Sequence, residues 1–584
     1  MVKPIAVMVA LLMSGVVWSQ SNPRPFVKLV QPVRESTVVK NARQFISGST
    51  CKGCELTVNG TPVKVYSSGG FAYELNLKPG DNQFNLLARS GTNTIARLVT
   101  FRYAPTAPPD TVKTLGIASI EINPAGNLLV RAGDKLRFRI KALPNARVFA
   151  IDSIPLYELP TGPGQTMPGI YQGEYTVRST DSFASLRIPF FIKDTTGNTV
   201  TRRADQTISM LNPQKQGMII TRGRLAHLLY GTGEDRLGGA KIGYIDSSIV
   251  LQVTGKVNDL YRVQLTPYRT AYIPDDVVEP VPPGYLSPKS LTGSWRVYGD
   301  SVNDYVTVAL DARLPYQSIQ LVDPSRIVVD VFGATINTNW ITQFENASEI
   351  KNVSYEQLED EVVRITIDLR HQQHWGHRIF YTGNRLNIQV RHQPQQLDLR
   401  HLRIAIDAGH GGSNTGAGGP TGSSEKELAL AVSLKLKKAL QYYGAHVIMT
   451  RQTEQFVDNK ERILMYRDSM PDLLISIHLN SSADPVNVGG TGTFYRYIGF
   501  RPLSHLIYKR MLELGLKEYG NTGSFNFMLN SPIEYPNALV EMLFISNPEE
   551  ESLILEEKFQ QEIADKIVQG IKDFLQSCQK GGER

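Results

Sequence analysis

The sequence predicts a multidomain chain in which all-β modules precede an α/β unit with a mostly parallel sheet. A chain of 584 residues is too long for one hydrophobic core, so about four or more domains are expected. Up to residue 394, short runs alternate apolar and polar residues between Gly, Pro and Asn turns, a pattern typical of strands. Beyond residue 400, strand-like runs alternate with segments of helical spacing, which indicates an α/β layer structure.

Composition and charge exclude some classes of partner. The formal net charge of +7 is a mild bias that favours anionic partners such as carboxylate-bearing polymers. No run of Lys and Arg marks a nucleic-acid footprint, so a nucleic-acid partner is not expected. The balance of 41% hydrophobic and 20% charged residues is that of a globular protein.

The first residues predict export. Lys3 precedes an apolar run from Ile5 to Val17, and the following Trp18-Ser19 resembles the end of a signal peptide at residues 1–19. This run is short for a bilayer, and no other stretch approaches about 20 apolar residues, so no integral membrane segment is expected. The predicted location is periplasmic or cell-wall associated.

Residues 25–104 and 111–213 are each predicted to form a β-sandwich. Asn59-Gly60 is a strong hairpin signal in the first, and Thr195-Thr196-Gly197-Asn198 separates two alternating runs in the second. The first module resembles bacterial immunoglobulin-like modules. A proline-rich linker, residues 104–110, lies between the two.

Three cysteines occur, at Cys51, Cys54 and Cys578. In an exported protein the first two could close a small disulfide ring, and Cys578 is left over. The alternative, a redox motif, requires a helix start after a strand, whereas these residues lie in β-patterned sequence.

The next two modules resemble accessory domains of bacterial wall proteins. In residues 217–284, the run VLQVTGKVNDLYRVQL resembles small Src-homology-3-like barrels. In residues 291–394, SIQLVDPSRIVVDVFGA and RIFYTGNRLNIQV resemble the AMIN domain, which implies peptidoglycan binding and septal targeting. Envelope or division proteins are candidate partners of these amino-terminal modules.

Three histidines in the AMIN-like module suggest a metal site. His371, His374 and His377 are separated by odd steps, so one strand would not present all three rings on one face. They are therefore interpreted as surface histidines near a strand end.

Residues 400–580 are predicted to form the α/β unit. Expected strands read LRIAI, AHVIMT, LLISI, TGTFYR, FNFML and ALVEML. Expected helices cover Glu425–Tyr443, Asn459–Asp468, Pro502–Tyr519 and Glu549–Gln576.

Polar residues in this unit stand where strands end or helices begin. His410 follows IAIDAG, Glu425 starts a helix, and His478 follows LLISI. Two imidazoles and one carboxylate on a catalytic zinc leave a position for water, whose pKa the metal lowers towards about 7. This donor set predicts a hydrolase site.

Glu425 has a competitor in Glu427. If Ser424 is the N-cap, Glu427 completes a capping box with it and Glu425 is free to bind a metal. In the alternative, both glutamates only offset the helix dipole.

Glu541 interrupts the apolar strand ALVEML. A buried carboxylate requires a partner, and near a zinc-bound water it could serve as general base. A solvent-facing glutamate at a strand end is the alternative.

Together, DAGHGG, SSEKELAL, SIHLNSS and LVEMLFISNPEE resemble the zinc-dependent N-acetylmuramoyl-L-alanine amidases over Leu402–Phe574. The resemblance implies one Zn²⁺ held by His410, Glu425 and His478, with Glu541 as the catalytic residue. It implies hydrolysis of the amide between N-acetylmuramic acid and L-alanine in peptidoglycan, for wall remodelling or daughter-cell separation.

The resemblance also implies lesser roles and a departure. Asn480 would border the substrate cleft, Asp407 would brace the His410 loop, and Arg462 would be structural. Some family members insert a long plug after the second histidine strand, but here little chain separates His478 from the Pro502 helix, so an open site is expected. Two rival functions are a zinc peptidase acting within the stem peptide and a non-catalytic wall-binding protein.

Overall fold

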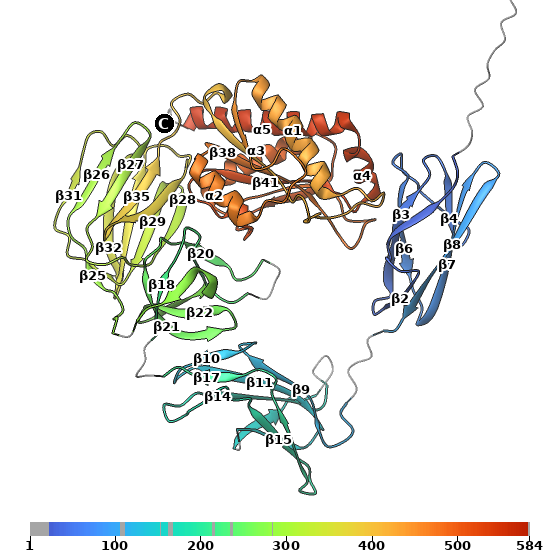
Figure 1. Cartoon of the computed structure of the whole chain (residues 1–584), viewed down its shortest axis with the longest axis horizontal. Coiled ribbons are helices and arrows are strands. Elements are labelled where there is room, and N and C mark those ends of the chain that lie inside the picture. Colours follow the sequence, from blue (N-terminus) through green and yellow to red (C-terminus); the bar gives the residue numbers. More distant parts are fainter. Residues whose placement is uncertain are drawn as a thin grey trace, which may run out of the picture.

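The computed structural model describes residues 23–105, 111–151, 153–161, 167–212, 217–233, 237–282 and 284–581. The expected export signal at residues 1–19 lies outside these ranges, as does most of the proline-rich linker. None of the helices within them combines the length and the apolar composition that a membrane crossing needs. Four β-rich units precede an α/β unit (Figure 1).

The first β unit, residues 25–104, consists of two sheets around one core. Its strands are β1 (Val27–Gln31), β2 (Ser36–Val39), β3 (Arg43–Thr50), β4 (Glu55–Val58), β5 (Thr61–Val63), β6 (Gly70–Asn76), β7 (Gly80–Ser90) and β8 (Asn93–Tyr103). The sheet β1-β3-β6 and the sheet β2-β8-β7-β4-β5 contribute buried side chains such as Ile46 and Leu86 to the same cluster. A disulfide joins Cys51 to Cys54 in the turn after β3, and Cys578 is free and buried.

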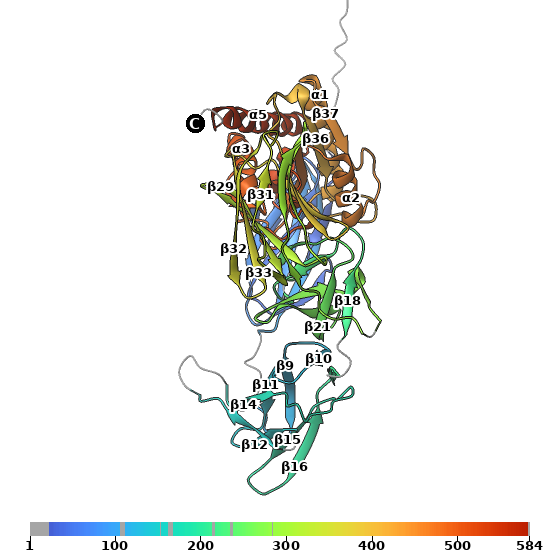
Figure 2. The ribbon, with the colours of Figure 1, turned by 90° about the vertical axis from the view of Figure 1, so that its left-hand side faces the viewer.

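The second β unit, residues 111–213, centres on a seven-stranded sheet in the order β16-β15-β12-β13-β14-β11-β9. Its strands are β9 (Ile117–Asn123), β10 (Leu128–Val130), β11 (Lys135–Ala142), β12 (Arg147–Ala150), β13 (Ile154–Glu158), β14 (Ile170–Thr176), β15 (Pro189–Lys193), β16 (Thr199–Arg203) and β17 (Ile208–Met210). In both views this unit lies farthest from the α/β unit (Figures 1 and 2).

The third β unit, residues 217–284, joins the second through strand pairing. Its elements are β18 (Met218–Thr221), β19 (His227–Leu229), β20 (Lys241–Tyr244), β21 (Val250–Val257), β22 (Leu260–Thr266), β23 (Arg269–Pro274), η1 (Asp275–Val277) and β24 (Val278–Pro280). Strand β10 of the second unit pairs antiparallel with β21, and β17 pairs with β10. The sheet therefore crosses the expected boundary between the two modules.

The fourth β unit, residues 290–394, shares a hydrophobic core with the third. Its strands are β25 (Ser290–Leu291), β26 (Trp295–Gly299), β27 (Asn303–Val308), β28 (Tyr316–Val322), β29 (Ser325–Phe332), β30 (Ala334–Thr335), β31 (Ile341–Gln343), β32 (Ile350–Glu359), β33 (Val362–Leu369), β34 (His377–Thr382) and β35 (Arg385–Arg391). Buried residues from Ile219 to Val390 form one cluster across both units. The two units are thus packed as one body.

The histidine segment of the fourth unit corrects one prediction. His374 and His377 are buried, not at the surface, and His371 bonds Glu349. They are buried because the segment docks on the α/β unit: Trp375 packs on Phe574 with ring centroids 5.6 Å apart. The backbone there approaches so closely that a Cβ on Gly376 would lie 2.2 Å from the carbonyl oxygen of Glu534.

The α/β unit, residues 399–581, is built on a six-stranded sheet in the order β37-β36-β38-β41-β39-β40. Its elements are η2 (Leu399–His401), β36 (Arg403–Ala408), α1 (Glu425–Tyr442), β37 (His446–Met449), α2 (Asn459–Ser469), β38 (Leu473–Asn480), β39 (Thr491–Phe494), η3 (Ile498–Phe500), α3 (Arg501–Leu512), β40 (Glu518–Thr522), η4 (Met528–Asn530), β41 (Asn537–Phe544), α4 (Pro548–Ile554) and α5 (Glu557–Gly581). Paired strands are parallel except β39 and β41. Helices α1, α3 and α5 pack together over one core, and Tyr466 of α2 belongs to a separate small cluster.

Three expected elements of this unit differ in the structure. The closing helix expected over Glu549–Gln576 is divided into α4 and α5, with a break after Ile554. The helix predicted to reach Tyr519 ends at Leu512, because Gly515 adopts a positive φ of 79° and the chain turns into β40. The expected strand FNFML is an extended segment followed by η4. Aromatic and polar residues alternate in this segment because Phe525 and Phe527 face a cavity, which is described below.

The first β unit docks on α4 and on the connection between β38 and β39. Arg43 Nη2 lies 2.6 Å from Asp484 Oδ2, and the hydroxyls of Ser67 and Ser552 are 2.5 Å apart. Although β units two to four separate it from the α/β unit in sequence, it lies beside α4 in space (Figure 1).

Candidate metal centre and active-site cleft

The three predicted metal ligands come together at the carboxyl ends of β36 and β38. One potential ligand atom from each of His410, Glu425 and His478 lies within 4.8 Å of the others. Glu425 Oε1 stands 3.0 Å from His410 Nε2 and 3.0 Å from His478 Nδ1. Because β36 and β38 are parallel neighbours, their carboxyl ends lie side by side, as expected for sites in open α/β sheets.

Local backbone geometry makes room for these side chains. A Cβ on Gly409 would lie 2.5 Å from the His478 ring, so only glycine lets that ring pack against the end of β36. Gly416 has a φ of 65°, and its Cβ would lie 2.5 Å from Glu425 Oε2. His410 itself is in the left-handed region, with a φ of 59°.

Ser424 is the N-cap of α1, but the expected capping box is not formed. Its side chain makes no cap hydrogen bond. Glu425 nevertheless occupies the first helical position and is buried, at 4% exposure. Its second oxygen, Oε2, accepts a hydrogen bond from the Ala417 amide at 2.8 Å, which fixes the carboxylate.

The electrostatics keep Glu425 ionised. Burial alone would raise its pKa, but hydrogen bonds and charges from His410 and His478 outweigh burial and hold that pKa far below the ordinary value. Burial would lower the pKa of His478, and the hydrogen bond to Glu425 raises it instead. A buried carboxylate beside two imidazoles is an environment that would stabilise a bound cation.

The residues fit a divalent metal ion. They offer two nitrogen donors and one oxygen donor around one point, and this donor set is common for catalytic sites with three protein ligands. Asn414 also fixes the orientation of the His410 ring, because His410 Nδ1 lies 3.0 Å from Asn414 Oδ1.

Asp407, Arg462 and Arg451 support the His410 loop. Asp407 is fully buried, and its Oδ1 lies 2.7 Å from Arg462 Nη1. Burial would raise the pKa of Asp407, and Arg462 lowers it below its usual value. Arg462 also donates to the His410 carbonyl at 2.5 Å, and Arg451 donates to the Gly409 carbonyl at 2.6 Å.

Glu541 and Asn480 border the same cavity. Glu541 lies opposite His478 in the parallel pairing of β41 with β38, and it is partly buried. Asn480, at the end of β38, accepts a hydrogen bond from the Ser481 amide at 2.8 Å. Both line a cavity of about 480 Å³ together with the three candidate ligands.

Three contributors to the site were not expected from the sequence. Arg451 lies two residues beyond the end of β37, so a polar residue just after a strand was the signal that could have found it. Asn414, in the loop after His410, carries no such signal. Leu237 lines the cavity from the third β unit, and local sequence cannot indicate a contact between residues so far apart.

The profile of the family described as N-acetylmuramoyl-L-alanine amidase matches residues 404–573, and the AMIN domain profile matches residues 295–390. The chain is 33% identical over 176 residues to the uncharacterized protein YqiI of Bacillus subtilis (strain 168), covering 29% of this chain and 84% of that protein. The chain belongs to the N-acetylmuramoyl-L-alanine amidase family. The resemblances to this family and to the AMIN domain are confirmed.

Other members of the amidase family are similar as well. The chain is 24% identical over 371 residues to N-acetylmuramoyl-L-alanine amidase AmiC of Neisseria meningitidis serogroup B, covering 48% of this chain and 89% of AmiC. It is 30% identical over 194 residues to the probable cell wall amidase LytH of Staphylococcus epidermidis, covering 33% of this chain and 65% of LytH. Among solved structures, the CwlV amidase catalytic domain of Bacillus (Paenibacillus) polymyxa var. colistinus is 30% identical, with a TM-score of 0.29, and the match covers 30% of this chain and 98% of that domain.

Proposed function

We propose that this protein is a zinc-dependent amidase that cleaves the bond between N-acetylmuramic acid and L-alanine in peptidoglycan. The observation that carries the proposal is the meeting of His410, Glu425 and His478 in one cavity with Glu541. Membership of the amidase family supplies the substrate class. A bound zinc ion would supply Lewis-acid activation of water and of the scissile carbonyl.

The protein's own residues would carry the proton transfer and the positioning. Glu541 faces the candidate ligands across the pairing of β38 with β41, so it can take a proton from the attacking water and return it to the departing amine. Asn480 lies at the edge of the cavity and can hold a polar group of the substrate. Arg462 and Arg451 keep the His410 loop in place and take no part in the chemistry.

The decisive experiment is digestion of purified sacculi with and without a zinc chelator. Mass spectrometry of the products should find free stem peptides that begin with L-alanine, together with glycan strands whose sugars are intact. Chelation should abolish release, and added zinc should restore it. Cleavage inside the stem peptide would instead identify a zinc peptidase, and a metal-free protein that only binds sacculi would contradict the enzymatic proposal.

We infer that the accessory units hold the enzyme on the exported wall polymer. The AMIN match supports binding of the fourth unit to peptidoglycan, and the signal-like start of the sequence supports export. The chain between β38 and α3 holds only β39 and η3 as regular elements, all of it described, which leaves no long insertion to cover the site. We therefore expect activity without an activator, and envelope or division proteins remain candidate partners of the amino-terminal units.

A further inference from the structure

We propose that the third β unit forms part of the substrate cleft, with Leu237 as a substrate-contacting residue beside the scissile amide. This inference rests on the proposed amidase function and extends it. Leu237 comes from the connection between β19 and β20, yet it lines the cavity that holds His410, Glu425 and His478. The cleft is therefore assembled from two units that are distant in sequence.

Glycines let the two arms of the connection between β19 and β20 lie very close together at its base. A Cβ on Gly239 would lie 2.0 Å from the Gly231 carbonyl oxygen, and a Cβ on Gly233 would lie 2.4 Å from the carbonyl carbon of Gly238. The two arms approach so closely that no side chain fits between them. Leu237 lies beyond this narrow base, on the side of the α/β unit.

Asn526 of the α/β unit binds this connection through its side-chain amide. Its Nδ2 donates to the Leu237 carbonyl at 3.1 Å and to the Gly239 carbonyl at 3.0 Å, and its Oδ1 accepts from the Lys241 amide at 3.4 Å. Arg496 completes the contact by donating to Asn526 Oδ1 at 2.6 Å and to the Lys241 carbonyl at 2.5 Å. One amide thus holds the described residues from Leu237 to Lys241 in place.

The residues on either side of Asn526 face the cavity. Phe525 and Phe527 line it, and the Phe527 ring meets the His478 ring edge to face at a centroid distance of 5.7 Å. Docking of the third unit on Asn526 therefore also positions these two aromatic rings, of which Phe527 packs against the candidate ligand His478. Separation of the two units would release both Leu237 and this aromatic pair.

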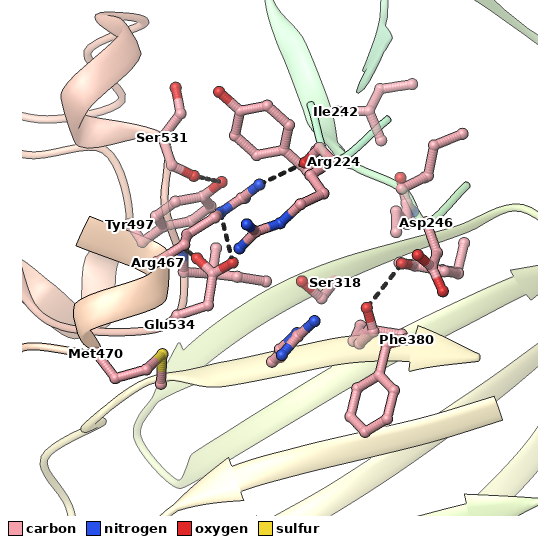
Figure 3. A pocket seen from close by; sticks show the side chains of 18 residues that line it. Arg224, Ile242, Asp246, Ser318, Phe380, Arg467, Met470, Tyr497, Ser531 and Glu534 are labelled. Atoms are coloured by element: carbon pink, nitrogen blue, oxygen red, sulfur yellow. Dashed lines mark hydrogen bonds and ion pairs between the residues drawn. The ribbon is translucent and has the colours of Figure 1, made fainter. Parts of the chain in front are cut away.

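The third unit is anchored firmly enough for this role. Arg467 of α2 donates to the Arg224 carbonyl at 2.7 Å, stacks over the Tyr244 ring at 4.3 Å and pairs with Glu534 at 2.8 Å. Figure 3 shows this junction, where the third, fourth and α/β units meet around a cavity of about 80 Å³. The core shared with the fourth unit adds a second attachment.

The chemistry of the cleft matches the substrate. Leu237, Phe525 and Phe527 contribute apolar surface to the cleft beside the ionisable candidate ligands. The bond to be cleaved is flanked by the methyl groups of the lactyl ether and of L-alanine. Apolar side chains next to an apolar part of the substrate stabilise its binding when water is excluded.

The test compares Leu237→Ala with the parent enzyme on a soluble muramoyl-peptide. We expect kcat/KM to fall about tenfold, mostly through KM, as for loss of methylene-sized contacts in an apolar pocket. Zinc content and the thermal midpoint should stay the same. Leu286→Ala, at an 81% exposed leucine outside the cleft, is the matched control and should behave like the parent.

Two further measurements separate contact from structure. In the Glu541→Gln background, titration calorimetry should show weaker binding of the intact muramoyl-peptide when Leu237 is also replaced. Asn526→Ala should increase hydrogen exchange at residues 237–241 and lower kcat/KM more than Leu237→Ala, because the Phe525–Phe527 segment is released as well. An unchanged or higher kcat/KM in Leu237→Ala overturns the inference, whereas an inactive parent enzyme overturns the proposed function instead.

Discussion

At the residue scale, a single carboxylate oxygen organises the centre. Glu425 Oε1 lies at hydrogen-bond distance from both imidazoles, and its partner oxygen is fixed by a backbone amide. In the proposed function, His410, Glu425 and His478 would hold the metal, and Glu541, which lines the same cavity, would transfer the proton.

Replacing Glu541 separates chemistry from metal binding. We expect Glu541→Gln to keep zinc but to lower kcat by about 10²–10⁴, the usual contribution of a general acid–base group. His410→Ala should lose the metal itself, because one of its three proposed ligands is gone. Metal analysis and turnover on muramoyl-peptide check both variants, and a Glu541→Gln enzyme with parental turnover would contradict the assignment.

His377 makes stability depend on pH. Burial, assisted by repulsion from His374, lowers its pKa to about 3, against about 6.5 in an unfolded chain. Between these values the unfolded state binds more protons, so the contribution of His377 to stability is complete above pH 6.5 and is lost as the pH falls. Between pH 7 and pH 5 the loss is about 2 kcal/mol.

Thermal or denaturant unfolding at these two pH values tests that expectation. His377→Gln should show a smaller loss of stability between pH 7 and pH 5 than the parent. His446→Gln, at an exposed histidine, should retain the parental loss. Identical losses in all three proteins would show that His377 does not stay neutral in the folded state.

At the scale of elements, short segments between regular elements do the docking. The segment around Trp375 joins the fourth unit to the α/β unit, and the segment around Asn526 joins the α/β unit to the third. In the second segment, Phe525 and Phe527 alternate with Ser524 and Asn526, a pattern that resembles a strand in sequence. The two rings line the cavity, and the Asn526 side chain binds the third unit.

Trp375 is the main apolar contact of the first of these segments. It is 2% exposed and packs in the core of the α/β unit. Trp375→Ala should lower the free energy of unfolding by about 3–5 kcal/mol, the range for deletion of a large buried ring. Denaturant unfolding measures the effect, and Trp340→Ala, at a 59% exposed tryptophan of the same unit, should change stability little.

At the scale of the whole molecule, the amino-terminal β unit packs against the carboxy-terminal α/β unit. The first β unit docks on α4 after three other units intervene in sequence, so the α/β unit contacts the first, third and fourth units. The contact between the first β unit and the α/β unit is polar. Arg43 bonds both Glu74 of its own unit and Asp484 of the α/β unit. A contact built on surface polar groups is expected to be sensitive to charge.

Reversing the charge at Arg43 should therefore separate the first β unit from the α/β unit. Arg43→Glu places a third carboxylate beside Glu74 and Asp484, and we expect a larger radius of gyration by small-angle scattering. Arg102→Glu makes the same change at an exposed arginine whose partner, Asp81, lies within the first unit. If Arg43→Glu keeps the parental scattering curve, the first unit is held by other contacts.

The accuracy of the predictions made from the sequence differs between segments. The positions of His410, Glu425, His478 and Glu541 at strand ends, a helix start and a strand interior were readable from local patterns, and the structure gathers all four around one cavity. The end of the third helix and the strand predicted at Phe525 were wrong, because Gly515 turns the chain and the two rings face the cavity. The histidines near Trp375 were placed at the surface, since burial by another unit leaves no local signal.

The sequence by itself determined the order of modules, the amidase and AMIN resemblances and the candidate ligand set, because periodicity and motif spacing are local properties. Only the tertiary structure decided that β10 extends the sheet of the third unit, that Trp375 belongs to the core of the α/β unit, and that Leu237 enters the cleft. These are contacts between residues far apart in the chain. They depend on the shapes and polar groups of two surfaces together, and neither segment encodes its partner.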